Sequence, residues 1–327
     1  MADIVRYGVL STAGIAVNRH VPSAQGADNT EIAAIASRDL VKAEKWAAEL
    51  GIARAYGSYE ELLNDPDIDA VINPLPNSMH CEWTVRAAQA GKHILCEKPL
   101  AVTVAEAREM IGAARANGVL LIEGFTHRLN PQLQCARRLV QQGEIGEVKL
   151  ARAELTFTIR DWEEDVRVKP ELSGGALLDA GCYCVSALRF ALNAEPVAVQ
   201  AFHHIRNGVD ATTTGVLRFA GDHLGYIATG MEAPFRCVLE VMGSHGVITV
   251  PNMFDDRADV RIAIGNDERV EQFSGPDRFQ VQIERFSNCI LEGKTPEFPA
   301  VDGLKNVAVL EALRESADTG QLVEVQT

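Results

Sequence analysis

The segment His93-Ile-Leu-Cys-Glu97-Lys98-Pro99 joins a short apolar run to two charged residues that could act on a substrate. The run predicts a strand, which would place Glu97 and Lys98 at its carboxyl end, where ligands bind in open α/β sheets. Pro99 restricts Lys98 to an extended backbone. A lysine partly desolvated at such a position can have a lowered pKa and take part in proton transfer. Taken alone, the segment favours a solvated lysine after a strand, because lysine is mostly exposed.

A turn of small residues follows the first predicted strand, residues 7–10, and opens a helix. It is close to the G-x-G-x-x-G/A fingerprint, whose missing side chains let the backbone approach a pyrophosphate at a helix N-terminus. Ser11 and Ala13 are small but are not glycine, a departure that bears on how tightly a cofactor is held. Similar turns also occur in proteins that bind no dinucleotide. The predicted cofactor contacts in this turn are Gly8, Ser11, Thr12, Ala13, Gly14 and Ile15.

The second predicted strand, residues 32–36, ends in Ser37-Arg38-Asp39. In NAD-specific sites an acidic residue about 20 positions after the glycine turn binds the ribose 2′-hydroxyl. Here a hydroxyl and a guanidinium come first, and both suit a 2′-phosphate because Arg offers it a planar set of donors. Ser37 and Arg38 therefore favour NADP(H). Asp39 keeps NAD(H) possible, and Arg38 could also be a solvated loop residue.

The elements that must position these residues change character near residue 125. Up to that point, short apolar runs alternate with helix-like stretches, which indicates βαβ units and a parallel sheet. Beyond it, longer alternating strands and one strong helix at 176–192 indicate an antiparallel sheet with helices on one face. We therefore predict an α/β protein: a doubly wound Rossmann domain over residues 1–125, then an α+β domain with a mostly antiparallel open sheet over residues 126–327.

Further segments complete a pattern that covers nearly the whole chain. They are Tyr59-Glu-Glu-Leu-Leu, Pro74-Leu-Pro-Asn77 with His80, Gly91-Lys-His ahead of Glu97-Lys98-Pro99, Glu123-Gly-Phe125 and Gly174-Gly-Ala-Leu-Leu-Asp179-Ala-Gly-Cys-Tyr183. The chain thereby resembles the Gfo/Idh/MocA-type oxidoreductases. With a tyrosine at position 183, the chain resembles the branch of the family that includes glucose–fructose oxidoreductase, dimeric dihydrodiol dehydrogenase and xylose dehydrogenase. It is less similar to the inositol dehydrogenase branch.

This resemblance implies hydride transfer between a nicotinamide and a carbinol or carbonyl of a sugar or polyol. It implies catalytic roles for Lys98, Tyr183 and Asp179, the last two sharing a helix face at spacing i, i+4. Asp179 and Tyr183 alone could be a locally satisfied polar pair. The implied cofactor contacts add Pro74, Leu75, Pro76, Asn77, His80, Glu97 and Lys98. The implied substrate contacts are Lys98, Arg128, Trp162, Asp179 and Tyr183.

The resemblance has two departures near the substrate. His127 and Asn130 stand where many relatives carry a tyrosine and a histidine, so substrate contacts there are expected to differ. Trp162 lies in a loop where a packing role is equally compatible with the sequence. In the expected mechanism Tyr183 removes the hydroxyl proton, and the charge of Lys98 favours the phenolate and the developing alkoxide.

The leading activity is therefore an aldose 1-dehydrogenase that uses NADP, with NAD possible. Oxidation of a trans-dihydrodiol or reduction of a keto-sugar comes next. A non-catalytic, cofactor-sensing protein on the same fold is the alternative of another class, because fold alone does not fix function. The resemblance and the commonness of symmetric assemblies also imply a homodimer or homotetramer.

Composition excludes several other classes of partner. A net charge of −14 and a pI near 5.1 make nucleic acid and anionic membranes poor partners. The sequence has no run of about 18 apolar residues, so we expect no membrane span. We also expect no secretory leader, because no basic segment followed by an apolar one precedes the first predicted strand. The seven cysteines show no CxxC spacing, so we expect no metal site. Together these features lead us to expect a cytoplasmic protein.

Overall fold

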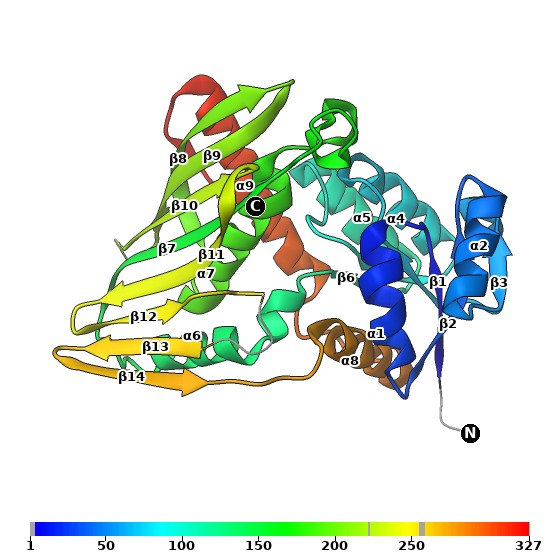
Figure 1. Ribbon diagram of the computed structural model, residues 1–327, viewed down its shortest axis with the longest axis horizontal. Coiled ribbons are helices and arrows are strands. Elements are labelled where there is room, and N and C mark those ends of the chain that lie inside the picture. Colours follow the sequence, from blue (N-terminus) through cyan, green and yellow to red (C-terminus); the bar gives the residue numbers. More distant parts are fainter. Residues whose placement is uncertain (1–3, 222, 255–258, 327) are drawn as a thin grey trace. The chain divides into compact units, whose positions relative to one another are not determined.

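A computed structural model describes residues 4–221, 223–254 and 259–326 of the chain. The chain divides into two compact units (Figure 1). Unit 1 holds Met1–Gly124 and Asp277–Leu304, and unit 2 holds Phe125–Pro276 and Lys305–Thr327. The sequence placed residues 277–304 with the second domain, whereas the structure packs them with the first.

The return of residues 277–304 to unit 1 has a clear physical basis. Ile283 and Phe286 are buried in the same core as Tyr7, and the Tyr7 hydroxyl lies 2.9 Å from Ser287 Oγ. A buried hydroxyl needs such a partner. Tertiary contacts of this kind leave no signal in local sequence periodicity.

Unit 1 is built on six parallel strands in the order β3-β2-β1-β4-β5-β6. This order is typical of Rossmann folds, and their ligands bind at the carboxyl ends where the order reverses, here between β1 and β4. Helices α1 and α8 pack together and on β2, and α4 packs on β4 and β5. The strands are β1 (Val5–Val9), β2 (Thr30–Ala36), β3 (Arg54–Tyr56), β4 (Ala70–Asn73), β5 (His93–Cys96) and β6 (Leu121–Glu123). The helices are α1 (Val21–Gln25), α2 (Leu40–Leu50), α3 (Tyr59–Leu63), α4 (His80–Gln89), α5 (Val104–Ala116), α8 (Arg278–Glu292) and the first residues of α9 (Ala300–Thr319).

Unit 2 is a nine-stranded sheet in the order β14-β13-β12-β11-β7-β10-β9-β8-β15. Its neighbours pair antiparallel except β7 and β10, which are parallel. The predicted mostly antiparallel sheet is thus confirmed. The strands are β7 (Val148–Thr158), β8 (Pro196–Arg206), β9 (Val209–Phe219), β10 (Leu224–Gly230), β11 (Glu232–Gly243), β12 (Gly246–Val250), β13 (Asp259–Ile264), β14 (Asp267–Gln272) and β15 (Val323–Glu324). The helices are α6 (Pro131–Gln141), α7 (Cys182–Leu192) and the rest of α9.

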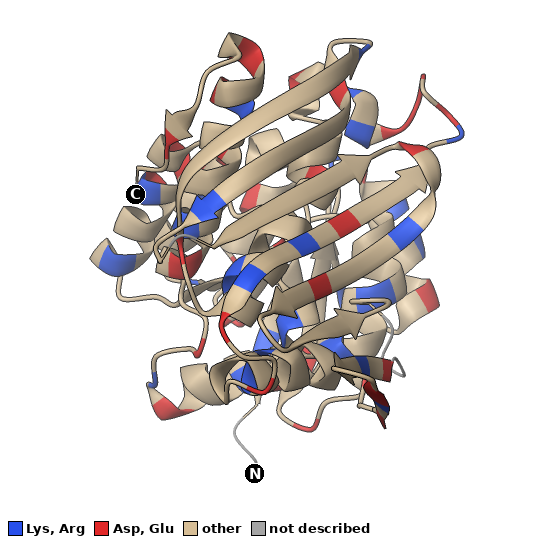
Figure 2. Cartoon of the chain, turned by 90° about the vertical axis from the view of Figure 1, so that its left-hand side faces the viewer, with Lys and Arg blue, Asp and Glu red and all other residues tan. Residues whose placement is uncertain are grey.

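One face of this sheet is covered and the other is open. Figure 2 shows the open face in front, with helices of the unit behind the strands. In strand β9, buried residues alternate with exposed ones, except that half-buried Asp210 stands at one of the outward positions, as expected of a strand with one solvated face. The inward residues, such as Leu217 and Ile227, form the core together with α7, which packs on β7, β10 and β11.

The segment of unit 2 that ends with α7 is unusually apolar. By length and hydropathy, the segment Pro170–Leu192 could cross a membrane, which the sequence analysis did not predict. In the structure, 83% of its apolar 18-residue stretch is buried. A helix that is apolar on all sides is expected where a large core encloses it.

Candidate functional site

The turn after β1 is organised by a hydroxyl instead of a second glycine. Ser11 Oγ accepts a hydrogen bond from the Ala13 N–H at 2.9 Å, so the serine side chain folds back onto its own turn. Gly14 and Ile15 follow at the surface, and a Cβ at Gly14 would find its nearest neighbour, Asn18 Nδ2, 3.7 Å away. The Ser11 side chain is thus bonded within the turn, and the backbone at Gly14 stays exposed.

The end of β2 separates the roles of its three polar residues. Asp39 is the N-cap of α2, and its Oδ1 accepts the Lys42 N–H at 3.3 Å. Ser37 is buried, and its Oγ accepts the Asp39 N–H at 3.2 Å. Arg38 is exposed. Burial of Tyr59 raises the pKa of its phenol, and the neighbouring Arg38 opposes that rise. The acidic residue is thus engaged by a helix end, whereas the guanidinium faces solvent.

His80 holds two loops of unit 1 together. It is 1% exposed, and Nδ1 lies 2.8 Å from Pro99 O while Nε2 lies 2.8 Å from Leu75 O. Burial lowers the pKa of His80, and the two carbonyl acceptors oppose that effect. Of the predicted cofactor residues in the preceding loop, Pro74 and Leu75 are buried, whereas Pro76 and Asn77 are half-buried. His80 therefore joins this loop to the turn after β5.

The segment after β5 brings a buried carboxylate next to the predicted lysine. Glu97 Oε2 accepts the Lys98 N–H at 3.2 Å, and Oε1 lies 2.6 Å from His20 Nε2. The Lys98–Pro99 peptide is cis, and Lys98 is half-buried. The next residue of the turn, Leu100, donates its N–H to Glu123 Oε1 at 2.7 Å. His20 and Glu123 were not among the predicted site residues.

In unit 2, Asp179 and Tyr183 lie on one continuous helical segment. Asp179 belongs to a π-helical turn, Leu177–Gly181, and Tyr183 is in the first turn of α7. Single π-helical turns are rare and often mark functional sites. Asp179 Oδ2 lies 4.0 Å from Arg167 Nη1, an ion pair that the sequence analysis missed.

An aspartate on β9 anchors the start of that segment. Asp210 Oδ2 accepts the Leu177 N–H and the Thr213 hydroxyl, both at 2.7 Å. Burial raises the pKa of Asp210, and these two hydrogen bonds oppose the rise. Gly175, with φ of +116°, passes so close that a Cβ there would lie 2.0 Å from Asp210 Oδ1. Gly175, the second glycine of the motif, is therefore required by the packing of the anchor, whereas a Cβ at Gly174 would lie 2.4 Å from the Arg167 carbonyl oxygen.

Tyr183 is set in an edge-to-face aromatic cluster. Its ring centroid lies 4.7 Å from Phe254, 5.1 Å from His127 and 5.5 Å from Phe125. Such pairs stabilise a fixed ring orientation. His127, one of the two departures from the resemblance, is fully buried in this cluster. Phe125 was noted only as part of the Glu123-Gly-Phe125 motif, and Phe254 was not noted. Their contacts with Tyr183 were not predicted, because a contact of side chains distant in sequence leaves no local pattern.

The other predicted substrate contacts make packing contacts in unit 2. Arg128 is 3% exposed and donates from Nε to Ser186 Oγ at 2.8 Å. The guanidinium carbon of Arg206 lies 4.0 Å from the Trp162 ring centroid, and Trp162 packs on a small core under its loop. Asn130, the second departure, donates from Nδ2 to Met253 O at 2.8 Å.

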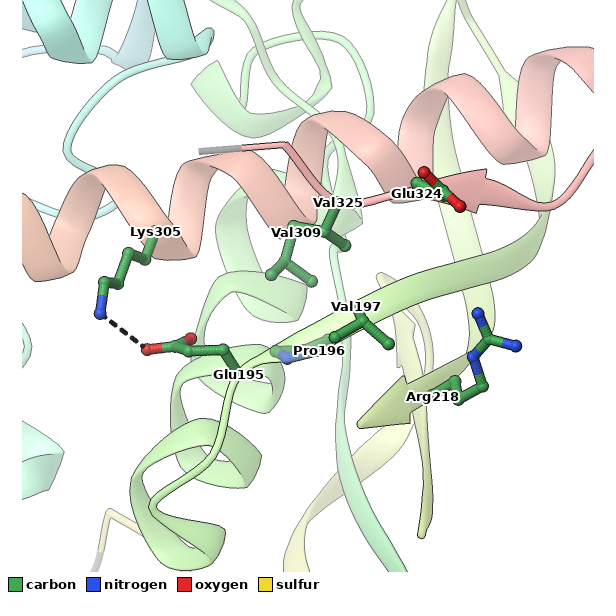
Figure 3. Close-up of a pocket in the computed structure, with 8 residues that line it drawn as sticks. All are labelled: Glu195, Pro196, Val197, Arg218, Lys305, Val309, Glu324 and Val325. Atoms are coloured by element: carbon green, nitrogen blue, oxygen red, sulfur yellow. Dashed lines mark hydrogen bonds and ion pairs between the residues drawn. The ribbon is translucent and has the colours of Figure 1, made fainter. Parts of the chain in front are cut away.

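A separate pocket of about 450 Å³ lies in unit 2 where β15 pairs with β8 (Figure 3). Lys305 Nζ and a carboxylate oxygen of Glu195 lie 3.3 Å apart on its wall. Val197, Val309 and Val325 supply apolar surface. None of the predicted site residues lines this pocket.

Two family models match the chain. The model of an oxidoreductase family with an NAD-binding Rossmann fold matches residues 5–125, and that of the GFO/IDH/MocA C-terminal domain matches residues 133–249. The chain therefore belongs to the Gfo/Idh/MocA family. The predicted enzyme class, a nicotinamide-dependent oxidoreductase, is confirmed.

Individual relatives are similar along almost the whole chain. D-xylose 1-dehydrogenase (NADP(+)) 2 of Haloferax volcanii is 35% identical, over 98% of this chain and 99% of the relative. Aldose-aldose oxidoreductase from Caulobacter crescentus, solved with glycerol, has a TM-score of 0.92 at 28% identity and covers 98% of this chain and 99% of its own. KijD10, a 3-ketoreductase from Actinomadura kijaniata solved with NADP and TDP-benzene, has a TM-score of 0.90 at 30% identity, over 96% and 98%.

Gly175→Ala should destabilise the protein by at least about 2 kcal/mol, because the new Cβ adds a clash with Asp210 to the strain of a positive φ. Urea unfolding followed by circular dichroism measures the change. Gly143→Ala is the matched control: its φ is +72°, nothing lies within 4 Å of the new Cβ, and the expected loss is about 1 kcal/mol. Equal losses in the two variants would contradict the anchoring role of Asp210.

Proposed function

We propose that this protein is an NADP-dependent aldose 1-dehydrogenase that oxidises a xylose- or glucose-like sugar to its lactone. The observation that carries this proposal is the similarity, over 98% of the chain, to an enzyme named D-xylose 1-dehydrogenase (NADP(+)). An aldose-aldose oxidoreductase of nearly the same fold gives further support. Reduction of a keto-sugar is the second candidate, favoured by the similarity to the 3-ketoreductase KijD10.

The cofactor preference is argued from the end of β2. A 2′-hydroxyl would be bound by an acidic side chain, but Asp39 already caps α2. Arg38 is exposed and has donors that suit a phosphate. The open turn at Gly14 would receive the pyrophosphate, with Ser11, Thr12, Ala13 and Ile15 around it. We therefore propose NADP(H) as the preferred cofactor.

The proposed chemistry divides among a few side chains. Bound NADP⁺ supplies the hydride acceptor, so the protein has to bind, orient and deprotonate. Tyr183 Oη takes the hydroxyl proton of the substrate, and the positive charge of Lys98 favours the ionised phenol. Asp179 accepts hydrogen bonds from other substrate hydroxyls. The rings that surround Tyr183 hold it in one orientation, which preserves the geometry that proton transfer requires.

Two alternatives make different demands on the same residues. A trans-dihydrodiol dehydrogenase would use Tyr183 in the same way on a less polar ring, and a frog enzyme of that name is 34% identical over 88% of this chain. A non-catalytic cofactor sensor would not need Lys98 and Tyr183 together, and both are present. We therefore place the sensor last.

We also propose that the protein forms a homodimer or homotetramer in the cytoplasm. None of the seven cysteines, all within the described residues, forms a disulfide bond, as expected in a reducing compartment. The open sheet face carries exposed Phe202, Val216 and Leu224 on three adjacent strands. Charges of both signs lie together on the middle strands (Figure 2), where Arg152 pairs with Glu154 and Glu240. Mixed charges and apolar residues on one face allow it to be self-complementary.

A panel of aldoses, polyols, keto-sugars and dihydrodiols tests the substrate and the cofactor together. We expect D-xylose or D-glucose with NADP⁺ to give the highest kcat/KM, measured as absorbance of the reduced nicotinamide. Contacts to a charged phosphate contribute roughly 1.5–3 kcal/mol, so NADP⁺ should exceed NAD⁺ by at least about tenfold. A preference for NAD⁺ would overturn the argument from Arg38, and activity confined to dihydrodiols would replace the proposed substrate.

Lys98→Met and Tyr183→Phe should each lower kcat by about 10²–10⁴-fold, because positioned proton transfer contributes that much. Cofactor affinity should be measured separately by quenching of protein fluorescence. Lys45→Met serves as the control, since Lys45 is an exposed residue of α2 whose ammonium lies 3.8 Å from Glu49, and it should keep kcat. Retention of more than about a tenth of kcat in both site variants would remove the proposed acid–base roles.

Val216→Arg should convert the assembly to a monomer, because it places a desolvated charge in the open sheet face. Sedimentation velocity at micromolar concentration measures the state. Val41→Arg changes an exposed valine on α2 of unit 1 and should sediment as the wild type does. If both variants keep the wild-type sedimentation coefficient, the interface does not lie on this face.

A further inference from the structure

A buried histidine–glutamate pair sits beside the predicted catalytic lysine and is not accounted for by the mechanism above. His20 Nε2 donates to Glu97 Oε1 at 2.6 Å, and the two side chains are 3% and 10% exposed. The His20 ring also meets Phe279 of α8 edge-on, with centroids 5.1 Å apart. The backbone of Lys98 therefore contacts the Glu97 end of the pair and Phe279 contacts the His20 end, both within unit 1.

The two carboxylate oxygens of Glu97 accept hydrogen bonds from different donors. Oε2 accepts the backbone N–H of Lys98, and Oε1 accepts His20. Burial by itself would raise the pKa of Glu97, but the hydrogen bond and charge of His20, together with the charge of Lys98, hold it below its usual range. Glu97 is thus a charged neighbour for Lys98 at neutral pH.

A buried carboxylate next to a lysine is a natural ion-pair partner for the ammonium. If no other donor served Glu97, its low-dielectric surroundings would favour capture of the Lys98 side chain. An ammonium drawn onto Glu97 would be displaced from a reacting hydroxyl. His20 lies at Glu97 Oε1 and the Lys98 N–H at Oε2, so each oxygen of this carboxylate already has a donor and its pull on the ammonium is reduced.

We propose that His20 is a positioning residue that acts through Glu97 to keep the Lys98 ammonium available to the substrate. This inference rests on the proposed role of Lys98. Such indirect control is effective because a displacement of about 1 Å can cost about 10²-fold in rate.

The position of His20 in the chain adds a link to the cofactor turn. His20 is the last residue of a π-helical turn, Ala16–His20, which directly follows the turn Ser11–Ile15. The Ala16 and Val17 N–H groups both bond to Ala13 O, at 2.9 and 3.1 Å. The backbone that would hold the pyrophosphate is thereby connected, through one helical turn and one hydrogen bond, to the residue that precedes Lys98.

A double-mutant cycle on the full-length enzyme tests this role. His20→Leu should lower kcat by about 10- to 100-fold, the range of a displaced catalytic group, while the KM of the sugar changes less than about threefold. His20→Gln keeps a donor near the Nε2 position and should recover most of the loss. Glu97→Gln removes the anion, and adding His20→Leu to it should have no further effect on kcat, because the two residues act in series.

His93→Gln is the matched control. His93 is a half-buried histidine at the other end of β5, where Nδ1 accepts the Leu120 N–H at 3.0 Å, and its replacement should leave kcat unchanged. Cofactor affinity and thermal unfolding of every variant separate a local effect from a folding defect. If His20→Leu does not fold, His20→Gln and Glu97→Gln with their double variant carry the comparison.

The outcomes distinguish this inference from the function it rests on. Additive losses in the cycle, or a His20→Gln variant no better than His20→Leu, overturn the positioning role of His20. An active Lys98→Met variant overturns the proposed role of the lysine itself. Wild-type kcat in His20→Leu together with an inactive Lys98→Met overturns the inference alone.

Discussion

The burial of two carboxylates at adjacent strand ends is the constraint on which unit 1 depends. Glu97 follows β5 and Glu123 ends β6, and both are 8% exposed. Buried charges are costly unless every lone pair has a donor. Both carboxylates have donors: the Leu100 N–H donates to Glu123 Oε1, and the Lys98 N–H and His20 donate to Glu97. Gly303 packs so closely that a Cβ there would lie 2.7 Å from Glu123 Oε2. The turn that carries Lys98 is thereby fixed at both ends.

Unit 2 also buries a carboxylate, that of Asp210, next to the segment that carries its site residues. Asp210 is held in a poorly solvated place by the backbone of the segment that it anchors, so the helix start and the sheet specify one another. Both units also begin their site-bearing helical segment with a π-helical turn, Ala16–His20 in one and Leu177–Gly181 in the other. Each turn follows a stretch of small residues, which lets backbone and buried polar groups approach closely.

The sequence predicted elements and residues that have a local pattern, and it missed those whose role comes from contacts between distant parts of the chain. Alternating apolar runs predicted the parallel strands of unit 1 except β3, a three-residue edge strand whose residues are only half-buried. The polar strand β14 was missed for a similar reason, since its charged residues show no inward face. Lys98 and Tyr183 stood out through their motifs. His20, Asp210 and Arg167 did not, because each acquires its partner only through the tertiary fold, and the same holds for residues 277–304.

The parallel pairing of β7 with β10 has a consequence for how unit 2 is made. Strand β7 is the first of its sheet to leave the ribosome, yet both of its neighbours, β10 and β11, come after α7 and the β8–β9 hairpin. Until they are synthesised, β7 has two unpaired edges, which are prone to unwanted association. Arg152 and Glu154 alternate with buried residues along it, and such charges give the nascent strand solubility during that interval. Charges on the sheet face would in this way protect the chain before the fold exists.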